Sequence, residues 1–251
     1  KPDRVIIGKY VKRRVSIVAH WGINFVAFCI AIYLSWTLET FWYLFIHLLT
    51  INLLWYYSMH LKRRFLIGNL LIAALTALVP ILVGFYFHQL YNIQDTLQHA
   101  QCIECINYYP FADKSGTNYV MWLSFGLAGF AFMLNLAREI VKDMEDVEGD
   151  KKLNAKTLPI VLGYSNTKWI SGIVLTGSVI GSFVLWIYFS ELTFIVLIPI
   201  IFAAFLVVIC FILLATSSQK KTYRKINHLI KFAMVAGLII PIYWKLLFLY
   251  G

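Results

Sequence analysis

The sequence predicts an all-α protein, a polytopic bundle of transmembrane helices. Of its 251 residues, 61% are hydrophobic and only 14% are charged, whereas a soluble domain is about half apolar and about a quarter charged. Seven apolar runs approach or exceed the roughly 20 residues that cross a hydrocarbon core of about 30 Å. Because a backbone in lipid must satisfy its own polar groups, runs of this kind should be helices.

The predicted spans are bounded by polar connections and by aromatic residues. We expect them at residues 15–36, 41–61, 66–87, 119–140, 168–190, 192–215 and 229–249. The first apolar stretch, Ser16–Trp36, is too long for the core of a signal peptide. Tryptophan and tyrosine favour the membrane interface, and they stand near the expected ends at Trp36, Trp42, Trp122, Trp169 and Tyr250.

Basic residues orient the predicted bundle. If Lys1 is cytoplasmic, then 62–65, 141–167 and 216–228 are cytoplasmic too, and these segments with their flanks hold 20 of the 22 Lys and Arg residues. We therefore expect a multi-pass protein of a bacterial-type cell membrane, with its C-terminus on the opposite side. The net charge of +10 fits an anionic membrane surface better than nucleic acid, because no compact basic domain is present to bind it.

The long connection 88–118 is polar, nearly neutral and expected on the opposite side from Lys1. Its Cys102 and Cys105 form a lone CxxC. A local disulfide or plain thiols are favoured over a zinc site, since no partner ligands accompany them.

Acidic residues cluster directly after the fourth predicted span. Five of the chain's twelve acidic residues fall between positions 143 and 150. On a helix, Asp143, Asp146 and Asp150 share one side, with Glu139 one turn earlier. Glu145 and Glu148 fall on the opposite face. Gly149 offers an early end to this helix, which would leave Asp150 on a turn.

Three like charges on one stripe repel each other, so cationic groups are expected nearby. One interpretation is a solvated helix end, neutralised by Arg138, Lys142, Lys151 and Lys152. The other is a Mg²⁺ site, because magnesium prefers one or two carboxylates plus phosphate oxygens, and neighbouring lysines can hold the phosphates. The cluster adjoins a membrane span, which favours the functional interpretation.

The stretch around the cluster resembles a known family. Residues 135–163, NLAREIVKDMEDVEGDKKLNAKTLPIVLG, are similar to the second aspartate-rich motif of the UbiA superfamily of intramembrane prenyltransferases. The similarity includes Arg138-Glu139, Lys142-Asp143, the DxxxD of Asp146 and Asp150, and the Lys-Thr-Leu-Pro…Gly run from Lys156 to Gly163.

Two further stretches carry the same resemblance. Residues 1–14 resemble the segment that follows the first aspartate motif of the family. Residues 56–69, YYSMHLKRRFLIGN, resemble its Tyr-Ser-x-x-Leu-Lys segment, which leads into a Gly-Asn helix start. Tyr57 and Lys62 are five residues apart, where some members show four. Ser58 therefore has the i, i+4 spacing that puts two side chains on one face of an α-helix.

The resemblance implies a nine-helix bundle, of which about seven helices lie in this sequence. The stretch KPDRVIIG at 1–8 echoes KTLPIVLG at 156–163, so an aspartate cluster is expected before the first copy as well. We therefore expect residues 1–251 to form a single transmembrane prenyltransferase domain that lacks two N-terminal helices and the first motif. Such a chain should have little or no activity on its own.

The resemblance also implies the chemistry, namely Mg²⁺-dependent transfer of a polyprenyl group from its diphosphate to an acceptor through an allylic carbocation-like state. By this resemblance, Asp143, Asp146 and Asp150 are the expected metal ligands and catalytic residues. The expected diphosphate contacts are Lys142, Lys151, Lys62, Arg4, Arg138 and Tyr57.

The acceptor is less sharply indicated. EIVKDMEDVEGD is most similar to the branch that prenylates glycerol-phosphate-type lipids, while hydroxybenzoate-, chlorophyll- and haem-type acceptors share the architecture. A non-catalytic transporter or lipid-binding protein is the competing class. Transporters place ionisable residues at mid-span, and these spans contain almost none, which favours chemistry at the membrane surface.

Overall fold

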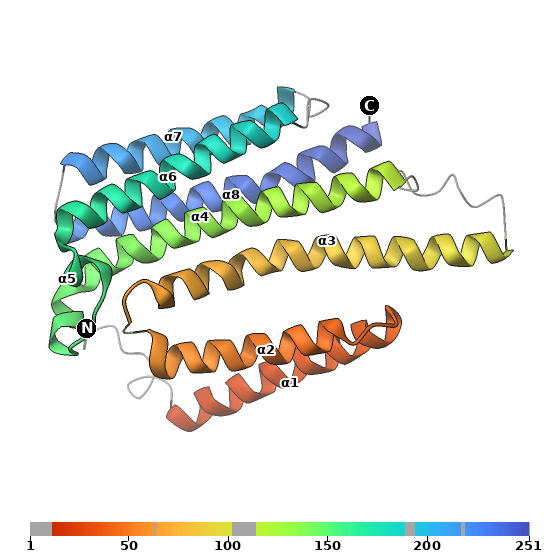
Figure 1. The fold of residues 1–251 in the computed structure, drawn as a ribbon, viewed down its shortest axis with the longest axis horizontal. Helices are drawn as coiled ribbons and strands as arrows, with labels where there is room; N and C mark the ends of the chain where they lie inside the picture. The colour runs from red at the N-terminus through yellow and green to blue at the C-terminus, as the bar shows by residue number, and fades with distance from the viewer. Residues whose placement is uncertain (1–11, 63, 102–113, 189–193, 217–218, 251) are drawn as a thin grey trace. The chain divides into compact units, whose positions relative to one another are not determined.

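The computed structural model describes residues 12–62, 64–101, 114–188, 194–216 and 219–250. Within these ranges the protein is helical and contains no strand (Figure 1). The elements are α1 (Arg13–Thr37), α2 (Trp42–Tyr56), η2 (Tyr57–Leu61), α3 (Ile67–Gln101), α4 (Lys114–Lys152), α5 (Leu158–Val161), α6 (Gly163–Tyr188), α7 (Phe194–Thr216) and α8 (Lys220–Tyr250). The predicted all-α class is confirmed.

Six of the described helices are long and apolar enough to cross a membrane. They correspond to the first six predicted spans. The seventh prediction, 229–249, lies within α8, but the side chains from residue 240 onward are outside the described part of the chain. The protein is an integral membrane protein with several spans.

The chain divides into two compact units, Lys1–Tyr56 and Tyr57–Gly251. In the first, α1 and α2 form a helical hairpin, and the Leu44 amide donates to Ser35 Oγ at 3.0 Å across its turn. Leu38 in that turn is fully buried, whereas Trp21 and Trp36 are 73% and 85% exposed. Large apolar side chains that face outward in this way suit a lipid environment.

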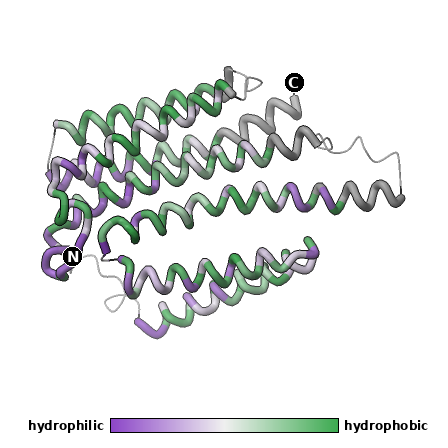
Figure 2. Tube along the Cα trace, viewed as in Figure 1, coloured by the Kyte–Doolittle hydropathy of each residue, from purple (hydrophilic) through white to green (hydrophobic). Residues whose placement is uncertain are grey.

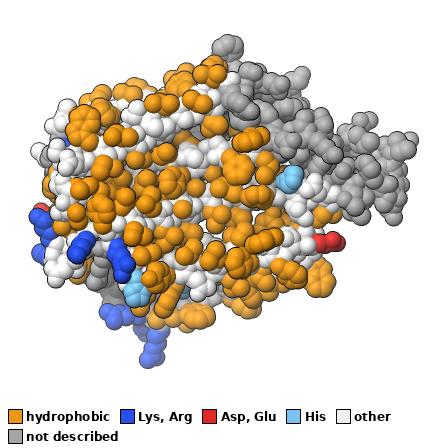
Figure 3. Space-filling view, in the orientation of Figure 1, with side chains coloured by type: hydrophobic (Ala, Val, Ile, Leu, Met, Phe, Trp, Pro, Cys, Tyr) orange, Lys and Arg blue, Asp and Glu red, His pale blue; other side chains and the backbone are white. Residues whose placement is uncertain are grey.

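Helix α4 is the centre of the second unit and packs against α3, α5, α6 and α8. The main core joins it to the C-terminal helices, with Met144 of α4, Leu175 of α6, Cys210 of α7 and Ile226 of α8 all buried. A smaller core joins Ala73 of α3 to α4 and α5. Hydrophobic side chains also cover the visible outer faces of the helices (Figure 3), as lipid contact requires.

Polar residues gather at one end of the second unit. Figure 2 shows them at the C-terminal end of α4, in the connection to α5 and at the start of α8. The short helix α5 and the start of α6 come from the KTLPIVLG stretch, whose Gly163 has φ of +79°. This left-handed conformation favours glycine, so Gly163 lets the chain turn from α5 into α6 beside the acidic cluster.

Candidate active site

The acidic cluster lies on the last turns of α4. The helix continues to Lys152, so the expectation that Gly149 ends it early is wrong, and Asp150 is helical. By length and composition, the predicted fourth span, residues 119–140, ends just before Asp143. The three aspartates therefore follow the predicted span directly.

Two of the acids pair with basic residues of α8. Glu145 is 8% exposed and accepts hydrogen bonds from Arg224 Nε and Nη2 of α8, both at 3.2 Å. Glu148 pairs with Lys220 Nζ, also of α8, at 3.1 Å. This face is the one opposite the three aspartates, as the helical spacing predicts, and its acids join α4 to α8.

Glu139 is buried, with 4% of its surface exposed. It pairs with Arg138 Nη2 and with Lys142 Nζ, the latter at 3.1 Å. Arg138 Nε also donates to Asn135 Oδ1 at 2.9 Å, and Asn135 Nδ2 donates to Thr76 Oγ1 of α3 at 2.7 Å. A buried carboxylate needs such partners. Arg138 and Lys142, which were expected to neutralise the cluster, form their ion pairs with Glu139, and Lys142 also lies within electrostatic range of Asp143 and Asp150.

The three aspartates are each half-buried. Asp143 Oδ2 accepts a hydrogen bond from Asn69 Nδ2 of α3 at 2.8 Å. Asp150 lies within electrostatic range of Asp146, Lys62 and Lys142. The expected basic neighbours Lys151 and Lys152 are exposed at the end of the helix.

Asn69 is a site residue that the sequence did not single out. It is buried at the start of α3, next to Gly68. A Cβ added to Gly68 would lie 2.7 Å from the carbonyl oxygen of Leu61, so only glycine permits this close approach of η2 to α3. The Gly-Asn pair of the segment that resembles the family could have indicated this residue. Its glycine allows η2 to approach α3 closely, and its asparagine donates a hydrogen bond to Asp143.

The segment between α2 and α3 brings two more predicted residues to the cluster. Residues Tyr57–Leu61 form a π-helical turn, and the Lys62 amide donates to the Tyr57 carbonyl at 2.9 Å. The i, i+4 argument for Ser58 assumed an α-helix, whereas a π turn pairs residues five apart. Tyr57 lies within electrostatic range of Glu139, Asp143 and Arg138. The turn therefore brings Tyr57 and Lys62 to the aspartate face of α4.

Comparison with known proteins identifies the family. The model of the UbiA prenyltransferase family matches residues 1–237. The chain belongs to this family. No solved structure matches the chain.

Similar UbiA proteins include several digeranylgeranylglyceryl phosphate synthases. The one from Methanosphaera stadtmanae is 31% identical over 183 residues, which are 73% of this chain and 56% of the relative. The one from Sulfurisphaera tokodaii is 30% identical over 219 residues, covering 86% and 68%. The one from Pyrococcus abyssi is 52% identical over 62 residues, covering 23% and 22%. The chain thus spans about half to two-thirds of the length of the first two relatives.

The predicted site residues of this UbiA member are only partly brought together. Tyr57, Lys62, Arg138 and Lys142 lie around the aspartates, and Lys151 follows Asp150 on α4. Arg4 lies outside the described residues, as do Cys102 and Cys105. Their predicted roles remain predictions.

The donor set fits an open magnesium site. Among the described residues, no three acidic, histidine or cysteine side chains form a group that could hold a metal ion. On the aspartate face of α4, Asp143, Asp146 and Asp150 follow one another at intervals of about one helical turn. Two neighbouring aspartates can therefore share an ion, but all three cannot. Magnesium is satisfied by one or two carboxylates together with phosphate oxygens and water. The stripe therefore fits a metal held jointly with a diphosphate.

Proposed function

We propose that the protein transfers a polyprenyl group from a polyprenyl diphosphate to a glycerol-phosphate-type lipid acceptor. The observation that carries this proposal is the aspartate face of α4, to which Asn69, Tyr57 and Lys62 are brought from the preceding segment. The relatives named above support the acceptor class, because their product is digeranylgeranylglyceryl phosphate.

The reaction requires stabilisation of a leaving diphosphate. Cleavage of the allylic C–O bond leaves positive charge on the prenyl carbon and negative charge on the diphosphate. A Mg²⁺ ion, held by two neighbouring members of the set Asp143, Asp146 and Asp150, would neutralise part of that negative charge. Lys62, Lys151 and Arg4 are proposed to bind the phosphate oxygens by charge-assisted hydrogen bonds. Lys142 and Arg138 would do so from their positions beside Glu139.

A transfer assay tests this function. Vesicles containing the protein expressed from its complete gene are given geranylgeranyl diphosphate and a glyceryl phosphate carrying one geranylgeranyl chain. We expect a doubly prenylated product that disappears with EDTA and returns with Mg²⁺, while vesicles without the protein form none. Preferential prenylation of hydroxybenzoate would contradict the acceptor class. Absence of transfer to any acceptor would contradict the enzymatic function.

The site also requires its loops to lie on one side of the membrane, which we propose is the cytoplasmic side. In a variant whose only cysteine replaces Asp146, an impermeant thiol reagent should label opened vesicles but not intact cells. In a variant that retains only Cys102, the same reagent should label intact cells. Labelling of position 146 from outside would contradict the proposed topology.

A further inference from the structure

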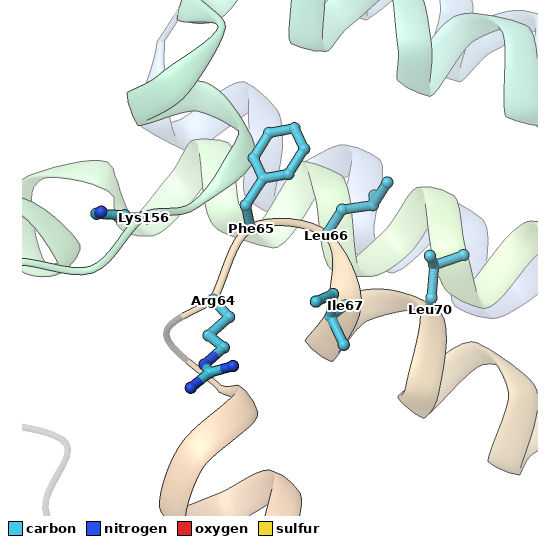
Figure 4. Close-up of a pocket in the computed structure, with 6 residues that line it drawn as sticks. All are labelled: Arg64, Phe65, Leu66, Ile67, Leu70 and Lys156. Carbon is cyan, nitrogen blue, oxygen red and sulfur yellow. The ribbon is translucent and has the colours of Figure 1, made fainter.

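A pocket of about 480 Å³ lies between the turn that enters α3 and the connection that follows α4 (Figure 4). Its wall is mainly apolar and comes from one short segment of the chain. The lining residues are Arg64, Phe65, Leu66, Ile67, Leu70 and Lys156. The pocket therefore combines a surface for an alkyl chain with two cationic side chains.

The two cations of the pocket differ from four basic residues of this end of the bundle that pair with glutamates. Arg138, Lys142, Lys220 and Arg224 all pair with glutamates of α4. The side chains of Arg64 and Lys156 are exposed and make no hydrogen bond or ion pair with the rest of the described chain. Their charge is therefore available to an anionic ligand.

The backbone of the pocket is tightly built. Leu66, which lines it, has φ of +54°, a conformation that is uncommon for a residue with a side chain and often occurs at functional sites. The Ile67 amide donates to the Phe65 carbonyl at 2.5 Å. Gly68 follows, at its close approach to Leu61. The turn thus holds the apolar wall in a fixed position.

The two segments that line the pocket also connect to the aspartates of α4. Asn69, between lining residues Ile67 and Leu70, donates to Asp143. Lys156 follows Asp150 after the short connection that leaves α4, in which the amide of Ala155 donates to the Asp150 carbonyl at 3.0 Å. The pocket is therefore built from the same two segments that adjoin Asp143 and Asp150.

We propose that this pocket binds the acceptor, with its phosphate on Arg64 and Lys156 and its first alkyl chain against Phe65, Leu66 and Leu70. The proposal rests on the function proposed above and specifies how the acceptor is recognised. A phosphate headgroup matches two unpaired cations, and an apolar chain matches the wall. The diphosphate donor is held separately, at the aspartates and Lys62.

Steady-state kinetics test the assignment. In Arg64→Ala and Lys156→Ala, the KM for the acceptor should rise about 10- to 100-fold, as expected for loss of a charge-assisted hydrogen bond. The KM for the prenyl diphosphate should stay within about twofold of its original value. Arg64→Lys should recover part of the loss because it keeps the charge. Lys152→Ala, which removes an exposed cation outside the pocket, should leave both KM values unchanged.

Two outcomes would overturn the acceptor site. One is an unchanged acceptor KM in the double variant Arg64→Ala/Lys156→Ala; the other is a rise in the donor KM equal to that of the acceptor. A bulk-lipid site would show itself differently, as an effect of the substitutions that depends on the anionic lipid content of the vesicles and not on acceptor concentration. Failure of the proposed function is distinct from all of these, because the unmodified protein would then not prenylate the acceptor.

Discussion

Asp150→Asn is expected to reduce prenyl transfer at least about 100-fold, the scale seen when one group that stabilises developing charge is removed. The substitution keeps the size of the side chain but removes the charge that would bind magnesium. Asp146→Asn should have a similar effect for the same reason. Initial rates at saturating donor, acceptor and Mg²⁺ measure the loss.

The opposite face of α4 supplies a matched control. Glu148→Gln makes the same change from acid to amide on the same helix, two residues from Asp150, but at a side chain that is 82% exposed and paired with Lys220. It should keep transfer within about twofold, because a surface ion pair contributes little. Thermal unfolding in detergent should show all three variants folded. If Asp150→Asn kept transfer within a few-fold of the unmodified protein, the assignment of Asp150 as a magnesium ligand would be wrong.

The membrane spans and the aspartate face could be predicted because they depend on local quantities. The length and polarity of an apolar run decide whether it crosses a bilayer, and a spacing of three or four residues decides which side chains share a helical face. The division of the acids into Asp143, Asp146 and Asp150 on one side and Glu145 and Glu148 on the other needed no more than this. The partners of Glu145 and Glu148 on α8 could not be predicted in this way, because they depend on how the helices pack.

Residues whose roles depend on contacts between helices could not be predicted. Glu139 shares the aspartate side by spacing, yet the packing of the other helices around α4 buries it, and its partners are Arg138 and Lys142 of its own helix. Asn69 lies 74 positions before Asp143, so no local pattern connects them. The unusual spacing of Tyr57 and Lys62 was visible, but its meaning depended on the π turn at Tyr57–Leu61, which the α-helical spacing rule does not describe.

Asn69 is also expected to be sensitive to substitution, because it fixes one oxygen of Asp143 at 2.8 Å. In Asn69→Asp, two carboxylates would face each other at the buried contact between α3 and α4. Loss of the hydrogen bond and exposure of Asp143 to a like charge should lower the free energy of unfolding by about 1–3 kcal/mol. Transfer should fall at least about 10-fold, because a displaced catalytic group is costly. Denaturation in detergent and transfer rates measure the two effects.

Exchange of the two side chains separates their structural role from their functional role. In Asn69→Asp/Asp143→Asn, the amide and the carboxylate change places, so the hydrogen bond can form again with its donor on α4. Stability should then recover most of what Asn69→Asp loses, as two coupled residues in contact require. Transfer should stay low, because the carboxylate is then on α3 and not on the aspartate face of α4. Recovery of stability and transfer together would mean that Asp143 serves only to hold α4 against α3. Recovery of neither would mean that the Asn69–Asp143 hydrogen bond does not couple the two helices.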